Sequence, residues 1–167
     1  MTTEINSTEI ARFLETLAEA PSRIAVATKG IPETRLTLRT EAEPWSVNDI
    51  LAHLRASADV REKFIHIMLT QDQPTERYIS PRSYIRKTNY PDLAFHESFQ
   101  AYKKQRNELL KRLGDLSIED WSRSATIKER AETVFTYTRY LTEHESAHCE
   151  QIEKLVKYRL SQKKLNA

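Results

Sequence analysis

The chain has 167 residues, a formal net charge of +2 and a single cysteine, Cys149. One cysteine excludes an intrachain disulfide, and only two glycines exclude a Gly-rich phosphate loop. The charges are interspersed, the N-terminus lacks a signal peptide, and no apolar run approaches the roughly 18 residues of a membrane span. We therefore expect one soluble, cytoplasmic all-α domain over residues 1–167 that binds neither nucleic acid nor membrane.

The first half of the chain predicts two long helices, each preceded by a start signal. Asn6 with Glu9 three residues later has the form of a capping box, in which a polar cap and an acid satisfy free backbone N–H groups. Ser46 and Asp49 repeat this signal before a second apolar stripe. The carboxylate of Asp49 could instead orient His53, four residues later, but capping is the favoured prediction.

Three stretches interrupt these helices. Pro21 is expected to kink or restart the first helix, because proline removes a hydrogen bond and clashes with the preceding turn. Residues 31–44 are predicted to be a connection with an extended piece at 36–38. Residues 72–91 hold three prolines and three tyrosines and form the long crossover of the bundle. Their tyrosines either cover the mouth of a pocket or pack on the side of the bundle.

The second half predicts two further helices with a short turn between them. A stripe from Phe95 to Leu113 contains one charged member, Arg106, which is expected to extend to the surface and pair with an acid there, or to meet an anionic substrate. Ser117 caps a short turn in which Trp121 closes one end of the bundle. The last helix is predicted over residues 131–160. Together these patterns predict a four-helix bundle with up-down helices and a long crossover between helices 2 and 3.

Two histidines four residues apart, His144 and His148, fall on the apolar stripe of the last helix. Burying two neutral imidazoles costs free energy unless both are satisfied, and one metal ion satisfies both. His53, at the edge of the second helix's apolar face, offers a third ligand. His66 and His96 lie off these stripes and are expected at the surface. Cys149 is turned away from the stripe and is expected to be an ordinary packed thiol.

Three short segments resemble those of the DinB-like four-helix bundles. Trp45–Leu54 is similar to their W-S-x-x-x-[IL]-L-x-H-L segment, and Leu141–Ile152 is similar to L-x-E-H-x-x-x-H-x-x-Q-I. Leu113–Trp121 is similar to the link before their last helix. One departure is residues 124–130, where the family's Gly-rich stretch has no glycine, so the pocket wall or substrate class is expected to differ.

The resemblance implies a divalent metal held by His53, His144 and His148. The family includes enzymes that depend on mycothiol or bacillithiol, and metal-dependent hydrolases. We therefore expect a metal-dependent thiol S-transferase that uses a low-molecular-weight thiol and a small-molecule substrate. The alternatives are a metal-dependent hydrolase and a non-catalytic metal-binding stress-response module. The metal is Zn, Ni, Fe or Mn, Arg106 and Tyr84 are candidates for orienting the substrate, and a homodimer is a further prediction.

Overall fold

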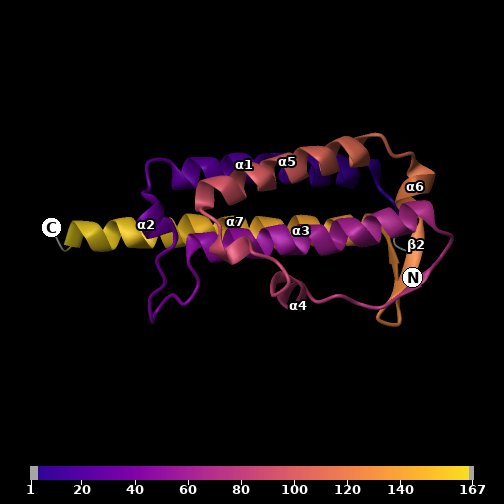
Figure 1. Ribbon diagram of the computed structural model, residues 1–167. Helices are drawn as coiled ribbons and strands as arrows, with labels where there is room; N and C mark the ends of the chain where they lie inside the picture. Colours follow the sequence, from indigo (N-terminus) through magenta and orange to yellow (C-terminus); the bar gives the residue numbers. More distant parts are fainter. Residues whose placement is uncertain (1–3, 166–167) are drawn as a thin grey trace.

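The computed structural model describes the backbone of residues 4–165 and the side chains up to residue 158. Long helices dominate this part of the chain and pack side by side (Figure 1), which confirms the predicted four-helix bundle. Its four long helices are α1 (Ser7–Thr28), α3 (Val47–Thr70), α5 (Phe95–Gly114) and α7 (Val134–Leu165). None of the described helices is long and apolar enough to cross a membrane.

The helices are arranged so that α1 and α3 lie diagonally across the bundle. Both of them pack against α5 and against α7. The predicted crossover between α3 and α5 runs back along the bundle, so these two helices point in the same direction (Figure 1). This crossover is not wholly irregular, because it contains three short elements, β1 (Thr75–Glu76), α4 (Pro81–Ile85) and the 3₁₀ turn η1 (Tyr90–Asp92).

The predicted helix starts are confirmed. The side chain of Asn6 accepts hydrogen bonds from the backbone N–H groups of Thr8 and Glu9, but the Glu9 carboxylate accepts from Arg139 instead of completing the predicted box. Ser46 and Asp49 form a complete capping box at the start of α3. Ser117 and Asp120 do the same before the short helix α6 (Ile118–Ser122). Each cap satisfies N–H groups that a helix leaves unpaired at its first turn.

Two local predictions in the first half need correction. Of the two outcomes predicted at Pro21, the restart is wrong, because α1 continues through Pro21 as one helix with Ala20 and Ile24 both buried. Residues 36–38 were expected to be extended, but Leu36 is the last residue of a short helix, α2 (Glu33–Leu36), and Thr37 keeps a helical backbone conformation. That turn places Leu36 in the core, with 4% of its surface exposed.

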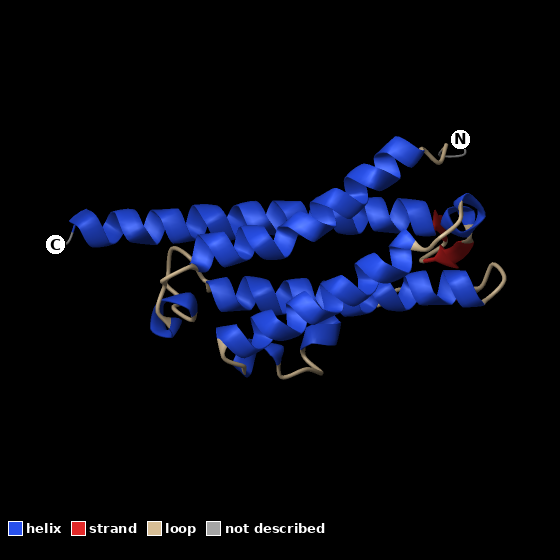
Figure 2. Ribbon diagram, turned by 90° about the horizontal axis from the view of Figure 1, so that it is seen from above, coloured by secondary structure: helices blue, strands red, loops and turns tan. Residues whose placement is uncertain are grey.

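A small β-sheet precedes α7 and was not predicted. Strands β2 (Ser124–Ile127) and β3 (Arg130–Thr133) form an antiparallel hairpin, and β1 adds to β2 in parallel. The strands lie at one end of the bundle (Figure 2), where Figure 1 shows β2 beside α6. Lys128 and Glu129 make the two-residue turn with φ of 51° and 63°, a left-handed conformation usually given to Gly or Asn. Helix α7 therefore begins at Val134 rather than at residue 131.

The interior consists of two apolar clusters separated by a polar layer. One cluster lies toward the hairpin end and includes Trp121, which is 2% exposed and closes that end as predicted. The other cluster includes Tyr102 and Cys149. Arg106 on α5 and Glu145 on α7 lie between the two clusters in sequence, and both are buried. On α7, His144 and His148 lie on either side of Glu145 in the sequence.

Candidate metal centre

The three predicted ligands come together on the adjacent helices α3 and α7. The Nε2 atom of His53 lies 3.1 Å from Nε2 of His144, and Nε2 of His148 lies 3.2 Å from that same atom. One ligand atom from each of the three rings lies within 4.8 Å of the ligand atoms of the other two. The i, i+4 spacing stacks the two rings of α7 on one face, and His53 approaches from the facing helix.

Burial keeps His53 and His144 neutral. It lowers the pKa of His53 to about 4, and the positive charges of Arg82 and Arg61 and the neighbouring His148 act in the same direction. Burial, followed by the same neighbours His148 and Arg61, lowers the pKa of His144 to about 3. Neutral imidazoles have a free ring-nitrogen lone pair, which is the form that binds a metal.

A hydrogen bond orients one of the three rings. Nδ1 of His148 lies 2.8 Å from the side-chain oxygen Oε1 of Gln151 and donates a hydrogen bond to it, because an amide oxygen can only accept. Nε2 of His148 is then the unprotonated nitrogen, and it faces the other two rings. A partner of this kind fixes the tautomer of a metal-binding histidine.

The donor set fits a divalent ion. Two nitrogens bound tetrahedrally at about 2.0–2.1 Å would lie about 3.3 Å apart, close to the two separations observed between Nε2 atoms. Without an ion, Nε2 of His144 has at most one proton to offer and cannot complete hydrogen bonds to both neighbouring Nε2 atoms. An ion accepts all three lone pairs at once, and three ligands leave a coordination position for a small molecule.

His53 also lines a cavity of about 450 Å³ on the outside of α3. Trp45 packs against His53 with ring centroids 5.3 Å apart. Asp49 belongs to the same wall, but its carboxylate accepts two hydrogen bonds from Arg39 and one from the backbone of Ser46. The favoured capping role of Asp49 is therefore confirmed. Its carboxylate binds Arg39 and the backbone of Ser46 rather than His53.

A family model described as the DinB superfamily matches residues 16–152. The chain belongs to the DinB superfamily. YfiT from Bacillus subtilis, described as a probable metal-dependent hydrolase with an unusual four-helix bundle topology, has a similar structure. The TM-score is 0.75 at 15% identity over 92% of this chain and 91% of that one, which establishes the shared fold. No curated protein matches the chain.

In this DinB-superfamily chain, the favoured expectation for Arg106 is wrong. Its side chain is 1% exposed and pairs with the buried Glu145, which also accepts a hydrogen bond from the Tyr102 hydroxyl. Arg106 does pair with a helical acid, but in the core rather than at the surface. The reason is that Glu145 lies inside as well, and an ion pair of this kind requires both charges to be buried together.

Tyr84, the other candidate for orienting a substrate, does not border the cavity of His53. It lines a separate cavity together with Asp59 and Tyr90. Tyr78 lies near Arg61, in a third cavity beside the hairpin. The tyrosines of the crossover therefore do not gather at the mouth of the His53 cavity, and a catalytic role for Tyr84 or Arg106 stays a prediction.

The remaining histidines and the cysteine are placed largely as expected. His66 and His96 are exposed and lie outside the cluster. Cys149 is a packed thiol with 1% exposure, and burial raises its pKa to about 12. It is not turned away from the core, however. At the level of the histidines, the fully buried positions of α7 are Glu145 and Cys149, each one residue after a half-buried histidine.

Sequence reasoning missed three residues around the site, Glu145, Gln151 and Arg61. Glu145 had a detectable signal, because it lies four residues from Leu141 and four from Cys149 on a helical stripe. Gln151 follows His148 by three residues, a spacing that allows side chains to meet on a helix. Arg61, two turns beyond His53 on α3, gave no distinguishing signal.

Proposed function

We propose that this protein is a divalent-metal-dependent S-transferase that acts with a low-molecular-weight thiol. His53, His144 and His148 would hold the ion, and zinc, nickel, iron and manganese all accept imidazole ligands. Such an ion supplies Lewis acidity that lowers the pKa of a thiol or water bound beside it. The convergence of the three Nε2 atoms carries the proposal.

The choice of a thiol over water rests on the absence of a free base at the site. Among the described residues that line the His53 cavity, the one carboxylate is Asp49, and Arg39 and Ser46 already occupy it. An unperturbed thiol has a pKa of about 8.5, against about 15.7 for water. A thiol therefore needs far less assistance to ionise, and a site without a general base is better suited to it.

The charge around the cavity supports an anionic nucleophile. Arg82 and Arg86 line it, and Arg82 and Arg61 act on His53 by lowering its pKa. Positive charges that line a cavity stabilise a thiolate bound in it and attract the carboxylates of a thiol such as glutathione. The orienting function predicted for Arg106 and Tyr84 passes, in this proposal, to Arg82 and Arg86.

A metal-dependent hydrolase is the second candidate. Three histidine ligands with an open position suit metal-assisted hydrolysis, and the described function of YfiT is of this class. The engaged carboxylate of Asp49 is the observation against it. A metal-binding module without turnover has the same three ligands and differs only in showing no activity.

Metal analysis of the purified protein tests the ligand set. We expect stoichiometric metal in the wild type and at least a tenfold loss of occupancy in His144→Ala. His96→Ala is the matched control, because it removes an exposed histidine outside the cluster. Wild-type protein that takes up no divalent ion after dialysis against zinc, nickel, iron or manganese would refute both enzyme proposals.

Conjugation assays then separate the three functions. The metal-loaded protein is given monochlorobimane with glutathione, bacillithiol or mycothiol, and in parallel a panel of ester and amide substrates. Thiol-dependent conjugation that is lost in His144→Ala but kept in His96→Ala supports the transferase. Turnover of esters or amides alone supports the hydrolase, and inactivity in both assays supports the binding module.

A further inference from the structure

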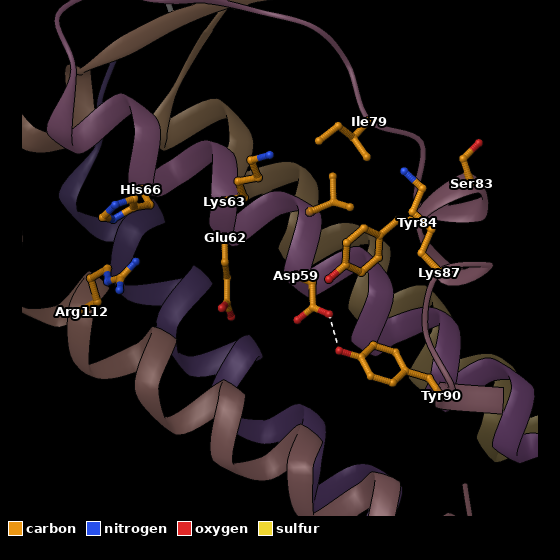
Figure 3. A pocket seen from close by; sticks show the side chains of 11 residues that line it. Asp59, Glu62, Lys63, His66, Ile79, Ser83, Tyr84, Lys87, Tyr90 and Arg112 are labelled. Atoms are coloured by element: carbon orange, nitrogen blue, oxygen red, sulfur yellow. Dashed lines mark hydrogen bonds between the residues drawn. The ribbon is translucent and has the colours of Figure 1, made fainter. Parts of the chain in front are cut away.

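A second and larger cavity, of about 710 Å³, lies between α3, the crossover and the C-terminal part of α5 (Figure 3). It shares no lining residue with the cavity of His53. A cavity of this volume is within the range that binds small molecules. The function proposed above makes no use of it.

Two carboxylates from α3, Asp59 and Glu62, point into this cavity from one face of the helix (Figure 3). Asp59 is fully engaged, because Oδ2 accepts from the hydroxyl of Tyr90 at 2.6 Å and Oδ1 accepts from Nε2 of Gln105 at 2.5 Å. Glu62 is different, since its Oε1 atom is buried and has no hydrogen-bond partner in the described part of the chain.

An unpaired buried carboxylate oxygen is costly, and a ligand that donates to it removes the cost. Burial raises the pKa of Glu62 to about 7, and the charge of Asp59 acts in the same direction. In contrast, Arg106, Arg112 and a hydrogen bond with Gln105 favour the ionised form. Oε1 of Glu62 is therefore an acceptor that the described residues leave without a donor. An ammonium group would supply that donor together with a positive charge.

The rim of the cavity has the opposite charge. Lys63 on α3, Lys87 after α4 and Arg112 on α5 all line it, and all three side chains are exposed. They come from three separate elements and border one opening. Cations at this rim would repel a simple amine but attract a ligand that also carries a carboxylate. Between the two charged zones, Ile79 and the ring of Tyr84 provide apolar wall (Figure 3).

We propose that this cavity binds a zwitterion, an amino acid or short peptide whose ammonium pairs with Glu62 and whose carboxylate faces Lys63, Lys87 and Arg112. The spatial separation of acidic floor and basic rim carries the proposal. Binding here requires neither the histidines nor a metal, so it stands apart from the proposed function.

The test compares three probes that differ in charge, glycyl-L-phenylalanine, phenethylamine and 3-phenylpropionate. We expect the zwitterionic dipeptide to bind at least tenfold more tightly than either singly charged probe in calorimetric titrations of the full chain. Glu62→Gln, which keeps the shape of the side chain, should weaken dipeptide binding about tenfold, the effect of one charged hydrogen bond. Glu143→Gln, an exposed glutamate on α7, is the matched control and should change nothing.

Location is checked by ¹H–¹⁵N NMR, in which the dipeptide should shift amides of residues 59–66 in wild type and in His144→Ala alike. Arg112→Met should reduce dipeptide affinity but should not reduce that of phenethylamine, because phenethylamine has no carboxylate to pair with Arg112 and is repelled by the rim cations. The proposal is overturned if the three probes bind equally, if none binds at millimolar concentration, or if Glu62→Gln binds as wild type does. Shifts confined to His53 and His148 would overturn it as well.

Discussion

Replacing Arg106 by methionine should strongly destabilise the protein while leaving its shape intact. Arg106 is 1% exposed and Glu145 2% exposed, and the two pair in the layer between the apolar clusters. Methionine has a similar volume, so little cavity forms. The main effect of Arg106→Met is that Glu145 keeps a buried charge without its partner.

The size of this effect follows from the burial of the pair. Removing one partner of a buried ion pair costs about 3–5 kcal/mol, because the remaining charge is uncompensated. At about 2–4 °C per kcal/mol for a chain of this length, the melting temperature should fall by about 6–20 °C. The Tyr102 hydroxyl still donates to Glu145, which places the expected loss toward the lower end.

A matched variant separates the lost pair from lost packing. Arg106→Met combined with Glu145→Leu and Tyr102→Phe removes the charges and the hydroxyl together. Replacing a whole buried polar group by apolar residues is often neutral or stabilising. We therefore expect the triple variant to recover most of the stability lost in Arg106→Met.

Urea unfolding followed by circular dichroism measures both variants. An Arg106→Met variant within 1 kcal/mol of wild type would refute the reasoning, since it would mean that Glu145 gains water or a proton at little cost. A triple variant less stable than Arg106→Met would refute it in another way, by showing that packing in this layer matters more than charge.

Four further outcomes are expected. Gln151→Ala should weaken zinc binding about 10–100-fold in chelator competition, because His148 loses the hydrogen bond that keeps its proton on Nδ1 and leaves Nε2 free for the metal. Metal-free protein should lose stability in urea as pH falls from 6.5 toward 4, since His53 and His144 take up protons more readily unfolded than folded. Glu62, with its pKa raised to about 7, costs stability once ionised, so Glu62→Gln should be more stable than wild type at pH 8 by about 1–3 kcal/mol. Trp121→Ala should cost about 3–5 kcal/mol in the same assay.

The parts of the fold governed by short-range chemistry could be predicted from the sequence. Helix caps at Asn6, Ser46 and Ser117 involve neighbours within three residues, and each was identified correctly. The convergence of His53 with His144 and His148 could be predicted, because the apolar stripe of a helix indicates which of its faces packs against the other helices. That an ion binds there remains a prediction.

The missed features depend on contacts between distant segments. The hairpin before α7 has a Lys128–Glu129 turn without glycine, and its first strand is held by β1, about fifty residues earlier in the chain. Arg106 was expected at the surface because its partner is on another helix. A single stripe does not tell whether a charged residue has an equally buried partner, and only the packing of α5 against Glu145 decides it.

The five-residue helix α4 has a wider consequence, because it forms part of two cavities. Arg82 and Ile85 face the cavity of His53, whereas Ser83 and Tyr84 face the cavity of Glu62. This short helix is therefore a wall shared by two cavities, and a displacement of it would change the shape of both. If the ligands of the two cavities favour different positions of α4, each ligand would weaken the binding of the other. The affinity of each would change by the same factor.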